Sequence, residues 1–200
     1  MITIINYGMG NLGSVKNMFN YIGVESVITA DVDVIAKAEK ILLPGVGAFD
    51  RAMQKIDECG FRPVLDQKAL QEKIPVLGIC LGMQLLTTSS QEGQEKGLNW
   101  IPGKATKLPT TDQKVPNMGW SPVKLPRKSQ LSENFRKDAR FYFVHSYYIK
   151  ADDRKDVIMT TEYGVEFDAG IHRDNIYGVQ FHPEKSHKFG MQLLENFAKI

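Results

Sequence analysis

The sequence predicts an α/β protein with a three-layer, doubly wound, mostly parallel sheet that carries an antiparallel extension. In the first half, short apolar runs lead into glycine-rich turns and then into helical patterns, three times in succession. From residue 104 onward, short β-rich runs separated by turn residues replace this alternation. Strands that alternate with helices of about 10 to 15 residues form parallel sheets with both faces covered.

The first strand–turn–helix unit has an apolar run at 2–5, a turn at 6–10 and a helical pattern at 12–22. Two further units have strands at 40–43 and 75–79 and helices at 48–59 and 80–88. The strands expected in the second half span 104–108, 121–125, 141–149, 156–161, 165–173 and 175–181. A final helix is predicted by Phe189, Leu193 and Phe197, which recur at intervals of four residues.

Composition limits the function classes. A chain of 200 residues is typical of one domain, here 1–200. The 25 Lys and Arg residues nearly balance 23 Asp and Glu, so we expect no nucleic-acid partner. No apolar stretch approaches a membrane span of about 18 residues and the N-terminus lacks a signal-peptide pattern, so we expect a cytoplasmic protein without a membrane partner. Cys59 and Cys80 can form neither a disulfide framework nor a four-thiolate zinc site, and we expect no metal and no cofactor.

A cysteine lies at a predicted strand-to-helix turn, in Gly78-Ile79-Cys80-Leu81-Gly82. This arrangement is typical of a nucleophile elbow with Cys in place of Ser, in which small flanking residues permit a cramped backbone. The adjacent helix N-terminus favours the thiolate. The alternative interpretation is that Cys80 is a small buried hydrophobic residue between ordinary turn glycines.

A thiolate nucleophile needs a base, and the base needs an acceptor that orients it. His182 follows the apolar strand 175–181, and Pro183 is expected to turn Glu184 back toward the imidazole. The turn 44–47 can supply main-chain N–H donors for an oxyanion, together with the N–H of Leu81. The alternatives are a structural histidine and a plain strand-to-helix connection.

Four ordered motifs, LPGVGAF at 43–49, GICLGMQLL at 78–86, YFVHSY at 142–147 and GVQFHPEKS at 178–186, resemble class I glutamine amidotransferases, which use a Cys-His-Glu triad. The resemblance is closest to the glutaminase subunits of imidazole glycerol phosphate synthases in histidine biosynthesis. It extends from NYGMGN at 6–11 to the final helix. The resemblance implies the flavodoxin-like fold of that class.

The resemblance also implies the chemistry. Cys80 attacks the side-chain amide of glutamine, His182 moves the proton, Glu184 orients His182, and a glutamyl thioester is hydrolysed to glutamate with release of ammonia. The resemblance implies Gln84, Glu92, His145, Ser146 and Tyr147 as substrate-binding residues, beside the oxyanion donors Val46, Gly47 and Leu81 expected from the turns. Two alternatives stay open, namely that Gln84 faces solvent on its helix and that Glu92 belongs to the polar loop 89–97.

The resemblance further implies a partner, a (β/α)8-barrel cyclase that forms a heterodimer with the glutaminase, activates it and uses the ammonia to make imidazole glycerol phosphate and AICAR. The interface positions implied are Asn11, Asn117, Met118, Trp120 and Lys185. A lone Trp after a glycine is also common in protein cores. The family usually reads PHMGWN where this chain reads PNMGWS at 116–121, which leaves the ammonia acceptor open.

Three alternatives follow. The same glutaminase body resembles relatives that serve other acceptors, including the amidation of surface sugars. An inactive scaffolding module would lack a triad member, whereas Cys80, His182 and Glu184 are all present. A cysteine peptidase or γ-glutamyl hydrolase would use the same elbow without any partner.

Overall fold

The computed structural model describes residues 1–110 and 113–200. Its main sheet contains β1 Ile2–Ile5, β2 Ser26–Thr29, β3 Ile41–Gly45, β4 Val76–Cys80, β5 Ser89–Ser90, β6 Gly103–Lys107, β9 Tyr147–Ala151, β10 Val157–Glu162, β11 Glu166–Arg173 and β12 Ile176–Val179. The strand order is β2-β1-β3-β4-β12-β11-β9-β6-β5, and β10 pairs with β11 beside this path. A second, two-stranded sheet pairs β7 (Asn117–Pro122) with β8 (Arg140–His145).

The prediction of a mostly parallel, doubly wound sheet with an antiparallel extension is confirmed. The strands from β2 to β12 are parallel to their neighbours, whereas β11 and β9 continue the sheet in antiparallel pairing. Gly45 at the end of β3 is in register with Cys80 at the end of β4, and Val179 of β12 is in register with Ile79. The carboxyl ends of these three strands therefore meet at one edge, where α/β proteins place their ligand sites.

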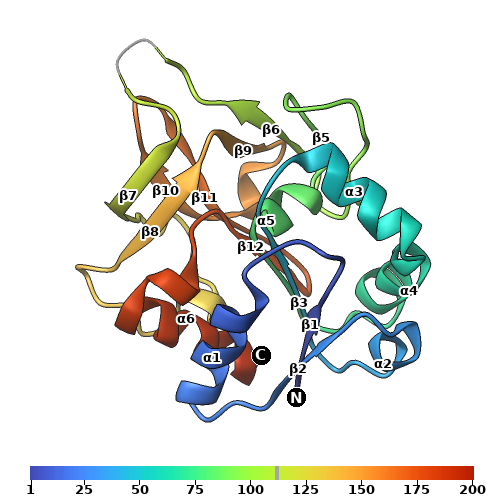
Figure 1. Cartoon of the computed structure of the whole chain (residues 1–200). Coiled ribbons are helices and arrows are strands. Elements are labelled where there is room, and N and C mark those ends of the chain that lie inside the picture. Colours follow the sequence, from blue (N-terminus) through green and yellow to red (C-terminus); the bar gives the residue numbers. More distant parts are fainter. Residues whose placement is uncertain (111–112) are drawn as a thin grey trace.

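Helices cover the two faces of the parallel part (Figure 1). They are α1 Leu12–Tyr21, α2 Val32–Ala36, α3 Phe49–Glu58, α4 Phe61–Asp66, α5 Leu81–Leu85 and α6 His187–Lys199. One hydrophobic cluster takes buried side chains from α2, α3, α4 and α5, and the other takes them from α1 and α6, which contact each other. Within the described residues, no helix is both long enough and apolar enough to cross a membrane.

Two predicted strands differ from the structure. The run 141–149 is predicted as one strand, but it is interrupted at Ser146, and β8 and β9 join different sheets. The predicted strand 121–125 is wrong in its bounds, because β7 begins at Asn117 and ends at Pro122. Both errors have one cause: a run of alternating apolar residues shows that a strand is half-buried, but it does not show which partner each part will pair with.

Candidate active site

Cys80 lies at the sharp turn between β4 and α5, with φ 54° and ψ −110°. This left-handed conformation is rare for a residue that is not glycine and stores strain. A Cβ at Gly78 would lie 2.6 Å from the carbonyl oxygen of Gly82, and a Cβ at Gly82 would overlap the carbonyl oxygen of Leu43. Glycine is therefore required on both sides of Cys80, because any side chain at Gly78 or Gly82 would collide with the backbone.

His182 and Glu184 meet beside this turn. Nδ1 of His182 donates a hydrogen bond to Oε1 of Glu184 at 2.8 Å, and both side chains are buried. Burial by itself would lower the pKa of His182, but interactions with Cys80 and Glu184 outweigh it and raise the pKa to about 10. Within the described residues, Nε2 of His182 has no aligned hydrogen bond. Nε2 is therefore the ring nitrogen without a fixed partner. The sulfur of Cys80 and the carboxylate of Glu184 stabilise the charged form of this imidazole.

The predicted oxyanion turn follows β3 directly. Val46 and Gly47 line the same cavity as Cys80, and Gly47 has φ +109°, a conformation that favours glycine. The turn is anchored by Tyr7, whose role was not predicted from the sequence. Its buried hydroxyl donates to the carbonyl oxygen of Pro44 at 2.5 Å, and burial, together with the nearby sulfur of Cys80, raises the pKa of this phenol.

Gln84 is buried and lines the cavity, so its side chain does not face solvent. Its Nε2 donates to the carbonyl oxygen of Tyr147 at 3.0 Å and to Oε1 of Gln180 at 3.2 Å. Gln180 in turn donates from Nε2 to the sulfur of Cys80 at 3.7 Å. Gln180 was not predicted as a site residue either, although a polar residue between the apolar Val179 and Phe181 was the available signal.

Glu92 joins the polar loop to the start of α3. Its Oε2 accepts a hydrogen bond from the N–H of Phe49 at 2.8 Å, and the carboxylate of Asp50 accepts from the N–H groups of Gln94 and Glu95, each at 2.9 Å. This reciprocal pairing fixes the loop over the cavity that Glu92 lines. Glu92 therefore belongs both to the polar loop and to the site.

His145 ends β8 and is held between two partners. Its Nδ1 lies 2.9 Å from the carbonyl oxygen of Tyr147, and its Nε2 lies 3.1 Å from Nδ2 of Asn117. Because a carbonyl oxygen can only accept, Nδ1 carries the proton and Nε2 accepts from the Asn117 amide. Burial lowers the pKa of His145 to about 4, and the nearby His182 adds to the effect. His145 is therefore neutral, and it lines the same cavity as Cys80 and His182.

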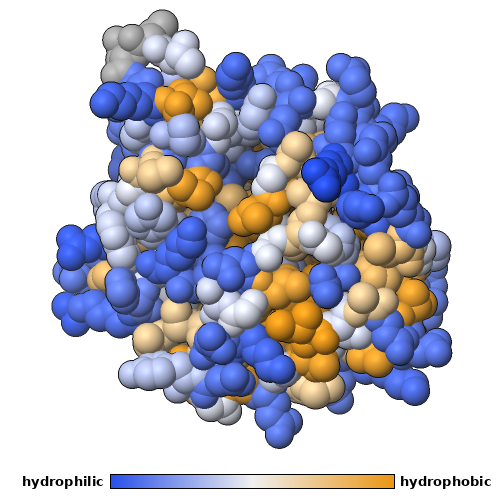
Figure 2. All heavy atoms as spheres, viewed as in Figure 1, coloured by the Kyte–Doolittle hydropathy of each residue, from blue (hydrophilic) through white to orange (hydrophobic). Residues whose placement is uncertain are grey.

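Four of the five predicted interface residues are exposed. Met118 and Trp120 on β7 are 62% and 42% exposed, and Lys185 and Asn11 are also at the surface. Asn117 is only 2% exposed and points inward, so it does not belong to this surface. Figure 2 shows apolar residues at the surface in the region of β7 and β8. Exposed apolar residues beside a cation are typical of an interaction surface.

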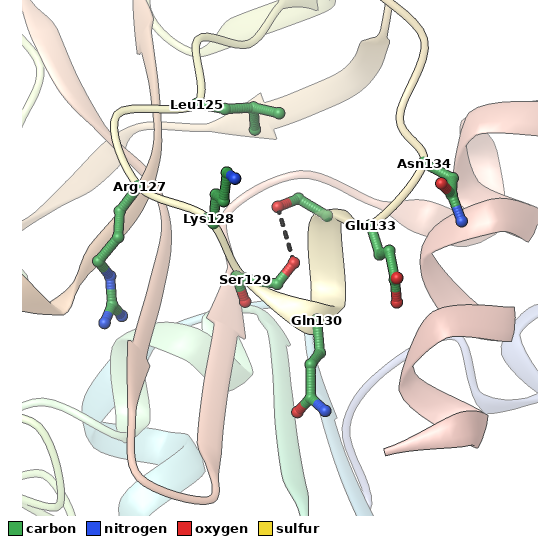
Figure 3. Close-up of a pocket in the computed structure, with 8 residues that line it drawn as sticks. Leu125, Arg127, Lys128, Ser129, Gln130, Glu133 and Asn134 are labelled. Carbon is green, nitrogen blue, oxygen red and sulfur yellow. Dashed lines mark hydrogen bonds between the residues drawn. The ribbon is translucent and has the colours of Figure 1, made fainter.

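The cavity lined by Cys80 and His182 has a volume of about 190 Å³, which is below the roughly 300 Å³ at which pockets for drug-sized ligands begin. A larger hollow of about 560 Å³ lies away from it, along the loop 125–134 (Figure 3). Its exposed side chains include Arg127 and Lys128 but no cysteine or histidine. The smaller cavity is the candidate site because, of the two, it alone is lined by a cysteine and by histidines.

The chain matches the family model described as "Glutamine amidotransferase class-I" over residues 3–200. It is 56% identical over 200 residues to "Imidazole glycerol phosphate synthase subunit HisH 2" of Methanococcus maripaludis, covering 100% of this chain and 99% of the relative. It is 44% identical over 201 residues to the protein of the same description from Pseudomonas aeruginosa, with 100% of both chains covered. A solved structure of PurLQS from Thermotoga maritima contains a chain of the same fold, with a TM-score of 0.73 at 17% identity over 99% of this chain and 97% of that chain.

Proposed function

The chain belongs to the class I glutamine amidotransferase family, and we propose that it is the glutaminase subunit of an imidazole glycerol phosphate synthase in histidine biosynthesis. In this proposal it hydrolyses glutamine and passes ammonia to a cyclase subunit. The observation that carries the proposal is the strained Cys80 beside the buried His182–Glu184 pair, with its Nδ1–Oε1 distance of 2.8 Å. The full-length identity to relatives of that name supports the pathway.

In the proposed reaction, Nε2 of His182 holds the proton given up by the Cys80 thiol, so a charged imidazole faces a thiolate. The sulfur attacks the side-chain amide carbon of glutamine, and the tetrahedral oxyanion accepts hydrogen bonds from the N–H of Leu81 and from the turn at Val46 and Gly47. His182 then gives its proton to the leaving nitrogen, which departs as ammonia and leaves a glutamyl thioester. Water, deprotonated by His182, hydrolyses the thioester and returns the thiol.

In this proposal, glutamine is held by polar groups that line the cavity. Both N–H groups of the Gln84 amide are engaged, by Tyr147 and by Gln180, so its free Oε1 can accept from the substrate ammonium. The carboxylate of Glu92 adds the opposite charge to that ammonium. The segment 145–147 lines the same cavity, and its main-chain groups are proposed to meet the substrate carboxylate.

The partner proposed for the exposed surface at Met118, Trp120 and Lys185 is a (β/α)8-barrel cyclase. A second candidate is the same glutaminase serving a different acceptor synthase, such as one that amidates surface sugars. Ser121 favours the second candidate, since it stands in β7 where the resembling family usually has Asn.

The test is glutamate release from glutamine by the purified chain, alone and with a barrel cyclase from the same cell, with and without the cyclase's nucleotide ligand. Strong stimulation that needs both the cyclase and the ligand is expected. Cys80→Ala should abolish the release and leave partner binding intact, whereas Cys59→Ser, the matched control, should behave as the parent. Turnover that survives Cys80→Ala would contradict the mechanism, and labelling of Cys80 by a glutamine-like electrophile without stimulation would favour another acceptor.

A further inference from the structure

One buried amide outside the triad touches the sulfur of the proposed nucleophile. Gln180 lies two residues before His182, is 0% exposed, and donates from Nε2 to Sγ of Cys80 at 3.7 Å. On the basis of the proposed function, we propose that Gln180 is a further catalytic residue: its amide N–H stabilises the Cys80 thiolate after the proton has moved to His182. Gln84 holds that amide in the donating orientation.

The orientation of the amide follows from one main-chain carbonyl. The oxygen and nitrogen of an amide side chain have nearly the same shape, so their positions must be assigned from their partners. The carbonyl oxygen of Tyr147 can only accept, so the atom of Gln84 that faces it is Nε2. The same Nε2 faces Gln180, whose nearer atom must therefore be the acceptor Oε1. The remaining atom of Gln180, the one that faces sulfur, is then Nε2, a donor.

A donor at this place has a chemical purpose. Cys80 is only 6% exposed, so little solvent can reach a negative charge on its sulfur, and a fixed hydrogen-bond donor can take the place of solvent. When Cys80 is protonated, the thiol proton can point to the carbonyl oxygen of Val144, 3.8 Å from the sulfur, while Gln180 donates from another direction. When the proton leaves for His182, the Gln180 bond becomes charge-assisted and therefore stronger.

The sulfur has several titratable neighbours, and each comes from a different element. They are His182 with Glu184 after β12, His145 on β8, Tyr7 after β1 and Glu92 from the polar loop. Gln180 is uncharged at all pH values, so its removal should shift the titration of the sulfur without adding a titration of its own.

The experiment measures the alkylation rate of Cys80 by iodoacetamide from pH 5 to pH 10, by mass spectrometry, in a Cys59→Ser parent. Cys59 is replaced because it is exposed and would react as well. Gln180→Met keeps the length of the side chain but removes the donor. We expect alkylation about tenfold slower at pH 7 and a midpoint about one pH unit higher, with an unchanged plateau at high pH. Gln192→Met on α6 is the matched control and should leave the profile unchanged.

A packing role would change the plateau, which reports access to the sulfur, and would leave the midpoint in place. A midpoint in Gln180→Met equal to that of the parent would overturn the proposal. Gln84→Met provides a second variant, which keeps Gln180 but removes the group that orients it. This variant should raise the midpoint of the alkylation profile by less than Gln180→Met does. An unchanged midpoint in both variants also overturns the proposal. If a glutamine-like electrophile fails to label Cys80 in the parent, the proposed function fails first, whereas normal labelling with unshifted profiles contradicts the role of Gln180 alone.

Discussion

The contact between Gly78 and the first turn of α5 gives a quantitative prediction for the geometry of the nucleophile turn. A Cβ at Gly78 would lie 2.6 Å from the Gly82 carbonyl oxygen and 2.8 Å from the N–H nitrogen of Met83, both inside the 3.0 Å that real Cβ atoms respect. Both neighbours are backbone atoms, so Gly78→Ala must displace the turn that begins at Cys80. Overpacking of this kind costs about 1–3 kcal/mol, and the reduced freedom of the unfolded chain returns about 0.4–1 kcal/mol.

We therefore expect Gly78→Ala to lower the free energy of unfolding by about 1–2 kcal/mol, measured by urea denaturation followed by circular dichroism. Gly13→Ala is the matched control, because Gly13 lies in α1 with nothing within 4 Å of its added Cβ. The control should raise the free energy of unfolding by about 0.5–1 kcal/mol, since alanine is the better helix former. The same chemical change thus has opposite signs at the two sites. Equal stabilities of the two variants would refute the reasoning.

Two further predictions concern buried polar groups near the site. Tyr7→Phe leaves the carbonyl oxygen of Pro44 without the phenol and should lower the free energy of unfolding by about 1–3 kcal/mol in urea denaturation; a variant within about 0.5 kcal/mol of the parent would show that the phenol does not hold the turn. The pKa of His145 falls from 6.5 to about 4 on folding, so the unfolded chain binds the proton first, and stability is lost as the pH falls from 6.5 to 4. Each pKa unit is worth about 1.4 kcal/mol. Between pH 7 and pH 4, the free energy of unfolding of the parent should therefore fall by about 3 kcal/mol more than that of His145→Gln, measured by urea denaturation. Equal losses in the two proteins would show that His145 does not cause the pH dependence.

The meeting of three strand ends at one sheet edge could be predicted from the sequence. Each of β3, β4 and β12 is a short apolar run, and Cys80 ends β4 while His182 follows β12 closely; neither residue is one that a strand needs. Parallel strands place such ends at the same edge, so the residues that share it follow from the pattern. The turn at Pro183 could also be predicted from the sequence, because proline fixes its own φ and restricts the backbone of the preceding residue.

The roles of Gln180 and Tyr7 could not be predicted, because each depends on a partner far away in the sequence. Gln180 meets Gln84 and Cys80 from positions about one hundred residues apart, and Tyr7 meets Pro44 across two adjacent strands. A polar residue in an apolar strand signals that some partner exists, since a buried amide without hydrogen bonds would be costly. The identity of the partner depends on the strand order and on side-chain direction, which periodicity does not contain.

The structure also bears on Asn117, one of the two positions at which the segment 116–121 departs from the resembling family. The carbonyl oxygen of Tyr147 accepts from both Gln84 and His145, and His145 in turn accepts from Asn117. Position 117 therefore requires a side chain that donates a hydrogen bond to His145, and a histidine at position 117 could also donate. Asn117 is buried and makes an internal hydrogen bond, so the residue at this position does not identify the partner. Ser121, at the far end of the same strand, is the departure that still bears on the choice between the two acceptors.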